Sequence, residues 1–173
     1  MTTRKRFLRT ICLLAAIALS AGCGYRIGYL GHPQLKSIAV APVVNDTLAY
    51  NVASNMRNLL CECFQTDGTM KLVGMKTADC IIYARVTAIS FSEISWSSSK
   101  NDTYLPNQWR VNLSAEFSVV LPGRAEPLLK GVKASGSAEF MSGPDIEISR
   151  NYAIKQACFV AAKDIVSQVT EAW

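Results

Sequence analysis

The chain has 173 residues and a formal net charge of +5, with eighteen basic residues, thirteen acidic residues and one histidine. Four of the basic residues lie within the first nine positions, so the chain after residue 22 carries a net charge of only +1. This near neutrality argues against a nucleic-acid-binding protein, which needs a basic surface.

The N-terminus has the parts of a secretory signal of the bacterial lipoprotein type. Basic residues from Arg4 to Arg9 precede an apolar run from Ile11 to Leu19, and small residues lead up to Cys23. The apolar run is too short to cross a bilayer. We expect cleavage after residue 22 and attachment of acyl chains such as palmitate to Cys23. Each buried methylene group contributes about 0.8 kcal/mol, so these chains would hold the mature protein on a membrane.

Two alternatives to lipidation stay open, an ordinary signal peptide and an N-terminal hydrophobic anchor. Ser20 stands three residues before Cys23, where lipoprotein signals usually carry leucine. The expected organisation is a signal peptide over residues 1–22, a lipidated tether over 23–35 and one domain over 36–173. The 151 residues after position 22 are enough for a sizeable core.

The first half of the domain predicts a strand, a helix and a second strand. Lys36 to Val44 alternates in the manner of a strand that lies near an edge or ends at Pro42. The polar residues 45–47 are expected to form a turn and cap a helix over Leu48 to Gln65, whose apolar face includes Leu48, and Gly68 ends it. A short strand is expected over Met70 to Gly74.

Three longer strands follow. In the first, from Ile81 to about Ser95, one face is expected to hold Ile82, Ala84, Val86, Ala88 and Ser90. In the second, from Trp109 to Leu121, apolar and polar residues alternate strictly, and a third strand alternates from Val132 to Phe140. This alternation indicates that one sheet face is buried and that the other is wet or covered by a partner.

The segment between the first two long strands, from Trp96 to Gln108, is predicted to be a loop. It is longer than an ordinary hairpin loop and carries Trp96, Tyr104 and Leu105 on a polar background. Long loops with such residues are often functional, so these three residues are candidates for contact with a partner. The alternative is a loop whose aromatic side chains fold back on the sheet.

A long helix is predicted from Ile146 to Val169, with Asp145 at its start. Its broad apolar arc includes Ile154, Cys158, Ala161, Ala162, Ile165, Val166 and Val169. The order of elements predicts an α+β fold, in which two helices pack on one face of a mostly antiparallel four-stranded sheet.

No catalytic set of residues is recognisable, so we expect a protein that is not an enzyme and has no cofactor. The cysteines after Cys23 are Cys61, Cys63, Cys80 and Cys158. Cys61 and Cys63 are two residues apart on the predicted helix and point in different directions, which disfavours a shared metal ion. Whether the four form disulfides or stay as buried thiols is left open.

Several segments resemble, in order, the LPS-assembly lipoprotein LptE family. They are Cys23-Gly24-Tyr25, the run SIAVAPVVNDT from Ser37 to Thr47, the run TDGTMKLV from Thr66 to Val73, and Ala78-Asp79. The resemblance implies a lipid-anchored protein on the periplasmic side of the outer membrane. It also implies that the protein plugs the LptD β-barrel, assists its assembly and binds lipopolysaccharide during transport to the outer leaflet.

Family members bind lipopolysaccharide through basic side chains. The candidates in this chain are Arg85, Arg110, Lys130 and Lys133, since anionic phosphates are bound by such donors. An alternative function is kept, because the run IAVAPVVNDT also resembles the first strand of lipoprotein subunits of export channels and other envelope complexes. Such a subunit would form homo-oligomeric rings, whereas a plug would form a one-to-one complex with a barrel.

Overall fold

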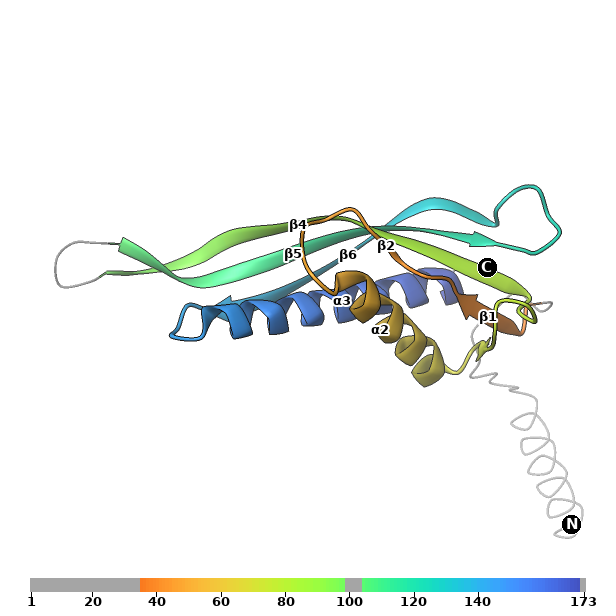
Figure 1. Ribbon diagram of the computed structural model, residues 1–173, viewed down its shortest axis with the longest axis horizontal. Helices are drawn as coiled ribbons and strands as arrows, with labels where there is room; N and C mark the ends of the chain where they lie inside the picture. Colours follow the sequence, from red (N-terminus) through yellow and green to blue (C-terminus); the bar gives the residue numbers. More distant parts are fainter. Residues whose placement is uncertain (1–34, 99–103, 172–173) are drawn as a thin grey trace, which may run out of the picture.

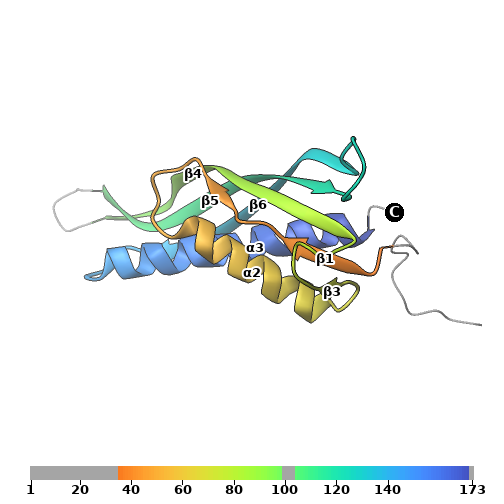
Figure 2. The ribbon, with the colours of Figure 1, turned by 45° about the vertical axis from the view of Figure 1, so that its right-hand side comes forward.

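The computed structural model of the protein describes residues 35–98 and 104–171, and the predicted signal peptide and Cys23 lie outside them. The described part has two layers, a mixed six-stranded sheet and two helices that both cover one face of it (Figures 1 and 2). The elements in chain order are β1 Ser37–Val40, β2 Val44–Asn45, α2 Val52–Asp67, β3 Lys71–Leu72, β4 Cys80–Ser98, β5 Tyr104–Val120, β6 Leu129–Met141 and α3 Ile146–Glu171. The predicted α+β class is confirmed.

The sheet differs from the prediction in strand number and direction. The strand order is β3-β1-β4-β5-β6, with β2 pairing β4 beyond the end of β1. β4, β5 and β6 form the expected antiparallel meander. β1 and β2 run parallel to β4, and β3 runs parallel to β1. Because α2 connects β2 to β3 as a crossover, the strands on either side of it can run in the same direction.

The predicted strand from Lys36 to Val44 is interrupted near Pro42, and its two halves are β1 and β2. The start of β1 is held by hydrogen bonds to the residue that precedes β4. The Asp79 carboxylate accepts hydrogen bonds from the backbone N–H groups of Lys36 and Ser37 and from the Ser37 hydroxyl, at 2.8–3.0 Å. These bonds lower the pKa of Asp79. They align the start of β1 with the start of β4.

The helix α2 begins at Val52, four residues after its predicted start. The expected cap at residues 45–47 is wrong, because Asn45 accepts hydrogen bonds from the backbone and hydroxyl of Thr47 and closes a turn instead. The residue at the cap is Asn51, with a left-handed φ of 59° and no side-chain cap bond. Leu48 therefore lies outside the helix and is fully exposed. The predicted stop at Gly68 is confirmed, with φ at 69°.

A register shift in β4 overturns part of the predicted alternation. The shift lies between Val86 and Ala88, where Thr87 is the extra residue. Ile82, Ala84 and Val86 are buried as predicted, but Ala88 and Ser90 lie on the exposed side. After the shift, Ile89 and Phe91 take the helix side of the sheet, since they pair with the buried residues Leu113 and Val111. A bulge of this kind exchanges the two faces of a strand.

The core lies between the helices and the sheet. Phe64, Phe117, Ile82, Leu113 and Ile165 are among its largest fully buried side chains. All seven residues predicted for the apolar arc of α3 are buried. Small residues allow α3 to lie very close to β6, since a Cβ atom on Gly136 would be 2.1 Å from the carbonyl oxygen of Ala157.

The predicted loop from Trp96 to Gln108 is wrong in conformation. β4 continues to Ser98 and β5 begins at Tyr104, so Trp96, Tyr104 and Leu105 belong to paired strands. The segment is extended because the residues pair across the hairpin, with Trp96 opposite Pro106. In Figure 1 this end of the hairpin extends beyond the first turn of α3.

Candidate functional site

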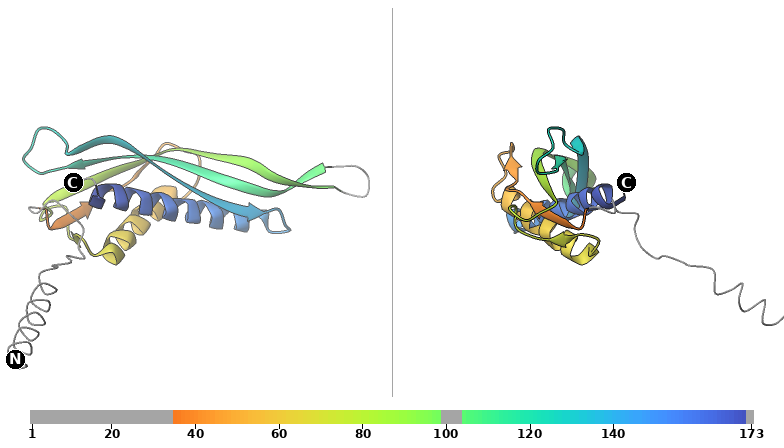
Figure 3. Two further views of the ribbon diagram at one scale, coloured as in Figure 1. Left: turned by 180° about the vertical axis from the view of Figure 1, so that it is seen from behind. Right: turned by 90° about the vertical axis from the view of Figure 1, so that its right-hand side faces the viewer.

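The face of the sheet opposite the helices is the principal candidate surface. Figure 3 shows both helices on the other side of β4, β5 and β6. Side chains with hydroxyl or amide groups are frequent on this face, and all of those that follow are exposed or half-buried: Ser90, Ser92, Asn112, Ser114, Ser118, Ser135 and Ser137. The expectation of a buried face and a polar open face is therefore confirmed. We refer to this surface as the outer face.

Cross-strand register arranges the outer face in rows. Two uncharged rows, Ala88-Ser114-Ser135 and Ser90-Asn112-Ser137, form its centre. A charged row flanks them on each side, Arg85-Glu116-Lys133 on one and Ser92-Arg110-Glu139 on the other. These four rows are thus mainly polar, and their charges of opposite sign lie next to each other. Toward the two ends of the face, Tyr83 and Met141 add exposed apolar surface.

Two of the arginines on this face have acidic partners. Arg110 donates to Glu139 through Nη2 at 2.6 Å and through Nε at 3.2 Å. Arg85 donates to Asp46 at 3.2 Å. Both pairs are well exposed, and exposed pairs of this kind contribute about 0–1 kcal/mol to stability. Their effect is to neutralise the outer face, which carries no concentrated positive patch in the described part of the chain.

The four candidate cations do not form a single cluster. Arg85 and Lys133 lie in the same row on either side of Glu116. Arg110 is six residues from Glu116 along β5, a separation of about 20 Å at the rise of an extended strand. Lys130 is exposed and precedes Gly131, whose φ of 61° accompanies a register shift in the pairing of β5 with β6. An anion as large as a lipid headgroup could therefore contact one row at a time.

The aromatic candidates lie at the end of the β4–β5 hairpin. Trp96 is 53 % exposed, although it is part of a strand. An exposed tryptophan at the end of a projecting hairpin offers a large apolar surface to a partner.

The cysteines that the structure describes are free thiols and form no disulfides among themselves. All four that the structure describes are free, with Cys63, Cys80 and Cys158 buried and Cys61 half-buried. Burial raises the pKa of Cys80 and of Cys158 to about 11. A neutral buried thiol is a poor nucleophile and a poor metal ligand. Among residues 35–98 and 104–171, the structure has no group of three acidic, cysteine or histidine side chains that could hold a metal ion.

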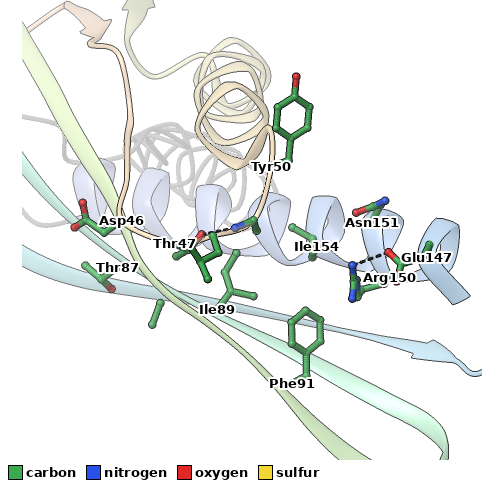
Figure 4. A pocket seen from close by; sticks show the side chains of 13 residues that line it. Asp46, Thr47, Tyr50, Thr87, Ile89, Phe91, Glu147, Arg150, Asn151 and Ile154 are labelled. Carbon is green, nitrogen blue, oxygen red and sulfur yellow. Dashed lines mark hydrogen bonds and ion pairs between the residues drawn. The ribbon is translucent and has the colours of Figure 1, made fainter.

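Sequence reasoning missed a groove of about 700 Å³ at the edge of the sheet. It lies between residues 46–50, the middle of β4 and the first turns of α3 (Figure 4). The bulge at Thr87 creates it by directing Ile89 and Phe91 toward α3. The sequence carried no signal for this groove, because a bulge leaves no periodic pattern in the sequence.

No helix in the described ranges is long and apolar enough to span a membrane. The sequence matches no family model, and no curated protein matches it.

Solved structures match the fold. XCC0632 from Xanthomonas campestris, of the family DUF330, aligns with a TM-score of 0.53 and 7% identity over 81% of this chain and 89% of that chain. A minor lipoprotein from Acinetobacter baumannii aligns with a TM-score of 0.52 and 10% identity over 80% and 94% of the two chains. A dodecamer of PelC from Paraburkholderia phytofirmans aligns with a TM-score of 0.50 and 9% identity over 83% and 94%. At these identities the likeness is one of fold, and it is a fold that bacterial lipoproteins adopt.

Proposed function

We propose that this protein is an outer-membrane lipoprotein that occupies the lumen of an LptD-type β-barrel, assists assembly of that barrel and takes part in lipopolysaccharide transport. The observation that carries the proposal is the outer face, whose four central rows are mainly polar and have their charges internally balanced. The interior wall of a large transmembrane barrel is polar as well. Hydroxyl and amide groups can leave water and contact such a wall at little cost in free energy, provided that each forms a new hydrogen bond there.

The shape of the molecule supports the same role. β4 has 19 residues and β5 has 17, so the hairpin is roughly 60 Å long at about 3.3 Å per residue. This is about twice the thickness of the hydrocarbon core of a bilayer. Two helices on one face of so long a sheet make a slender body (Figure 1). Such a body suits occupancy of a channel and does not need a catalytic pocket.

Lipopolysaccharide contact would fall to the cations of the outer face. Lys133 is exposed and forms no ion pair in the described part of the chain, while Arg110 is held by Glu139. An arriving phosphate could compete with Glu139 for the guanidinium, because carboxylates and phosphates are both oxyanions that arginine binds through two N–H groups.

A pull-down from detergent-solubilised membranes tests the barrel proposal. The tagged, lipidated protein should bring down one large outer-membrane barrel, and the native mass of the complex should correspond to one copy of each. The double variant Ser114→Lys with Ser135→Lys should abolish the complex, because it places two charges in the uncharged centre of the outer face. A variant with Lys155→Ser on the exposed side of α3 should retain it. Recovery of the protein without a barrel would contradict the proposal.

A second candidate function is a subunit of a ring-forming export channel. PelC, which shares the fold at a TM-score of 0.50, is a dodecamer. The run from Ile38 to Thr47 also resembles the first strand of lipoprotein subunits of export channels. The native-mass measurement separates the two functions, since a ring gives a homo-oligomer and a plug gives a one-to-one heteromer.

Membrane attachment through Cys23 is tested separately by growth with a clickable fatty acid. The protein should carry the label, and Cys23→Ser should lose it. Labelling that survives Cys23→Ser would show that the anchor lies elsewhere.

A further inference from the structure

Half of β4 has an edge that no described strand occupies. On the side away from β5, β4 pairs with β1 through Cys80–Ile82 and with β2 through Arg85 and Val86. From Ala88 to Ser98 the structure shows pairing with β5 alone. An open strand edge presents a row of backbone N–H and C=O groups that can pair with another strand.

The hydrogen-bond pattern identifies the backbone groups that face this edge. Before the bulge, the carbonyl oxygens of Ile82 and Val86 accept bonds from Ala41 and Asp46, so they point away from β5. The register shift at Thr87 moves this alternation by one residue. After it, Ile89, Phe91 and Glu93 direct their N–H and C=O groups to the open edge. Ala88, Ser90 and Ser92 direct theirs to β5.

On the opposite edge of the sheet, α3 covers two backbone groups near the start of β6. On β6 the Ser135 N–H donates to the Asp164 carboxylate at 3.0 Å, and the Lys133 carbonyl accepts from the Gln168 amide at 3.2 Å. Side chains of α3 therefore occupy the backbone groups that would otherwise recruit a strand. No comparable contact covers residues 89–93 of β4 in the described structure. These residues of β4 are therefore available for pairing.

The groove beside this edge has an apolar floor. Figure 4 shows Ile89 and Phe91 directed toward the first turns of α3. Phe91 stays 42 % exposed, although it packs edge-on against Phe140 at 6.4 Å and lies 5.9 Å from the Arg150 guanidinium. Leu48 and Tyr50 add exposed apolar surface at the far side. Side chains that reached this floor from an added strand would be removed from water.

The charges at the groove favour a basic residue in the partner. Arg150 is paired with Glu147 at 2.6 Å, and Asp46 is paired with Arg85. Glu93, on the open edge itself, is exposed and has no ion pair in the described part of the chain. The unmatched charge at the edge is therefore negative.

We propose that the β4 edge from Ala88 to Ser95 binds an extended segment of a partner protein by strand addition. The segment carries apolar side chains at alternate positions, which cover Ile89 and Phe91, and a basic side chain near Glu93. Backbone hydrogen bonds supply affinity in this mode, and the alternate side chains supply specificity. The inference stands apart from the barrel proposal, because it concerns the sheet edge and not the outer face.

Amide hydrogen exchange measured by NMR on the full lipidated chain in detergent tests the proposal. The probe is a capped octapeptide that alternates valine and threonine and has one central lysine. The peptide should slow exchange at the amides of Ile89, Phe91 and Glu93 by at least tenfold. The amides of Ala88, Ser90 and Ser92 should not change, because they already bond to β5.

Two variants should weaken peptide binding at least tenfold. Phe91→Lys places a charge on the apolar floor. Glu93→Pro removes an N–H that faces the open edge, without breaking a bond to β5. Met141→Lys is the matched control, since Met141 is a 70 % exposed residue on the opposite edge strand, and it should bind as the wild type does.

Three outcomes would overturn the proposal. The first is unchanged exchange at Ile89, Phe91 and Glu93 at millimolar peptide. The second is an equal loss of binding in Met141→Lys. The third is protection of the same amides without peptide that rises with protein concentration, which would assign the edge to a second copy of this chain. Each can occur whether or not a barrel is recovered in the pull-down.

Discussion

Gly136 on β6 and Ala157 on α3 are in backbone-to-backbone contact. A Cβ atom on Gly136 would lie 2.1 Å from the Ala157 carbonyl oxygen and 2.5 Å from the Ala161 nitrogen. Real Cβ atoms essentially never approach other atoms so closely. The absence of a side chain at one position of β6 thus sets the distance between the long helix and the sheet.

Gly136→Ala should destabilise the protein strongly. The new methyl group would meet backbone atoms, which cannot rotate away, so α3 would have to move from the sheet. We expect a loss of about 3 kcal/mol or more in the free energy of unfolding, at the upper end of the cost of overpacking. Urea denaturation measures it. Gly143→Ala is the control, since nothing lies within 4 Å of a Cβ there, and a similar loss in both variants would contradict the contact.

Removing the cover of the β6 edge should promote self-association. The double variant Asp164→Ala with Gln168→Ala frees the Ser135 N–H and the Lys133 carbonyl, which would then be open to another chain. Sedimentation velocity should show oligomers that grow with protein concentration. Lys155→Ala with Gln156→Ala, on the exposed side of the same helix, should stay at the wild-type mass. An unchanged mass in the first variant would mean that these contacts do not protect the edge.

The cysteines should differ in reactivity. Cys61 is half-buried, and Cys63, Cys80 and Cys158 are buried. We expect iodoacetamide at pH 8 to modify Cys61 first and to reach Cys80 and Cys158 only when the protein is unfolded, since the reactive thiolate is disfavoured by burial. Peptide mapping by mass spectrometry reads the order. Rapid modification of Cys158 in the folded protein would contradict its burial.

Stability should fall at alkaline pH because of the same thiols. Burial raises the pKa of the Cys80 and Cys158 thiols to about 11 in the folded protein, from an ordinary value of 9.0 that we take for the unfolded chain. The unfolded chain therefore loses these protons first, and stability that is complete below pH 9 is lost as the pH rises toward 11. The loss is roughly 2 to 3 kcal/mol per thiol. Denaturation midpoints between pH 8 and 11 measure it, and a Cys80→Ala, Cys158→Ala variant should show a shallower fall. An equal slope would mean that other groups cause it.

Lipopolysaccharide binding should depend on the outer face if the proposed function is correct. Arg110→Ser with Lys133→Ser removes one donor from each charged row, and we expect roughly tenfold weaker binding, the equivalent of one charge-assisted hydrogen bond. Arg57→Ser with Lys155→Ser changes net charge equally on the exposed sides of the helices and should leave binding intact. Unchanged binding in the first variant would eliminate that pair, and equal weakening in both would indicate only a dependence on net charge.

Features that depend on neighbours along the chain could be predicted from the sequence. The alternation from Trp109 to Leu121 correctly predicted that β5 is a strand with one buried face, because side chains two residues apart in a strand point to the same side. The spacing from Ile154 to Val169 placed one arc of α3 in the core. Gly68 ended α2 because glycine adopts a positive φ without strain. The polar outer face followed from the same alternation.

Features that depend on contacts between distant segments were decided by the tertiary structure. The bulge at Thr87, the parallel pairing of β1 with β4 and the extension of the hairpin past Trp96 all arise from strand register. Register is set by which residues meet across the sheet, and neither strand alone records it. The separation of Arg85 and Lys133 from Arg110, and the open edge of β4, follow from that pairing. The sequence by itself determined which residues are buried in β5 and along α3, and only the folded sheet determined where the buried face of β4 changes and which residues lie side by side.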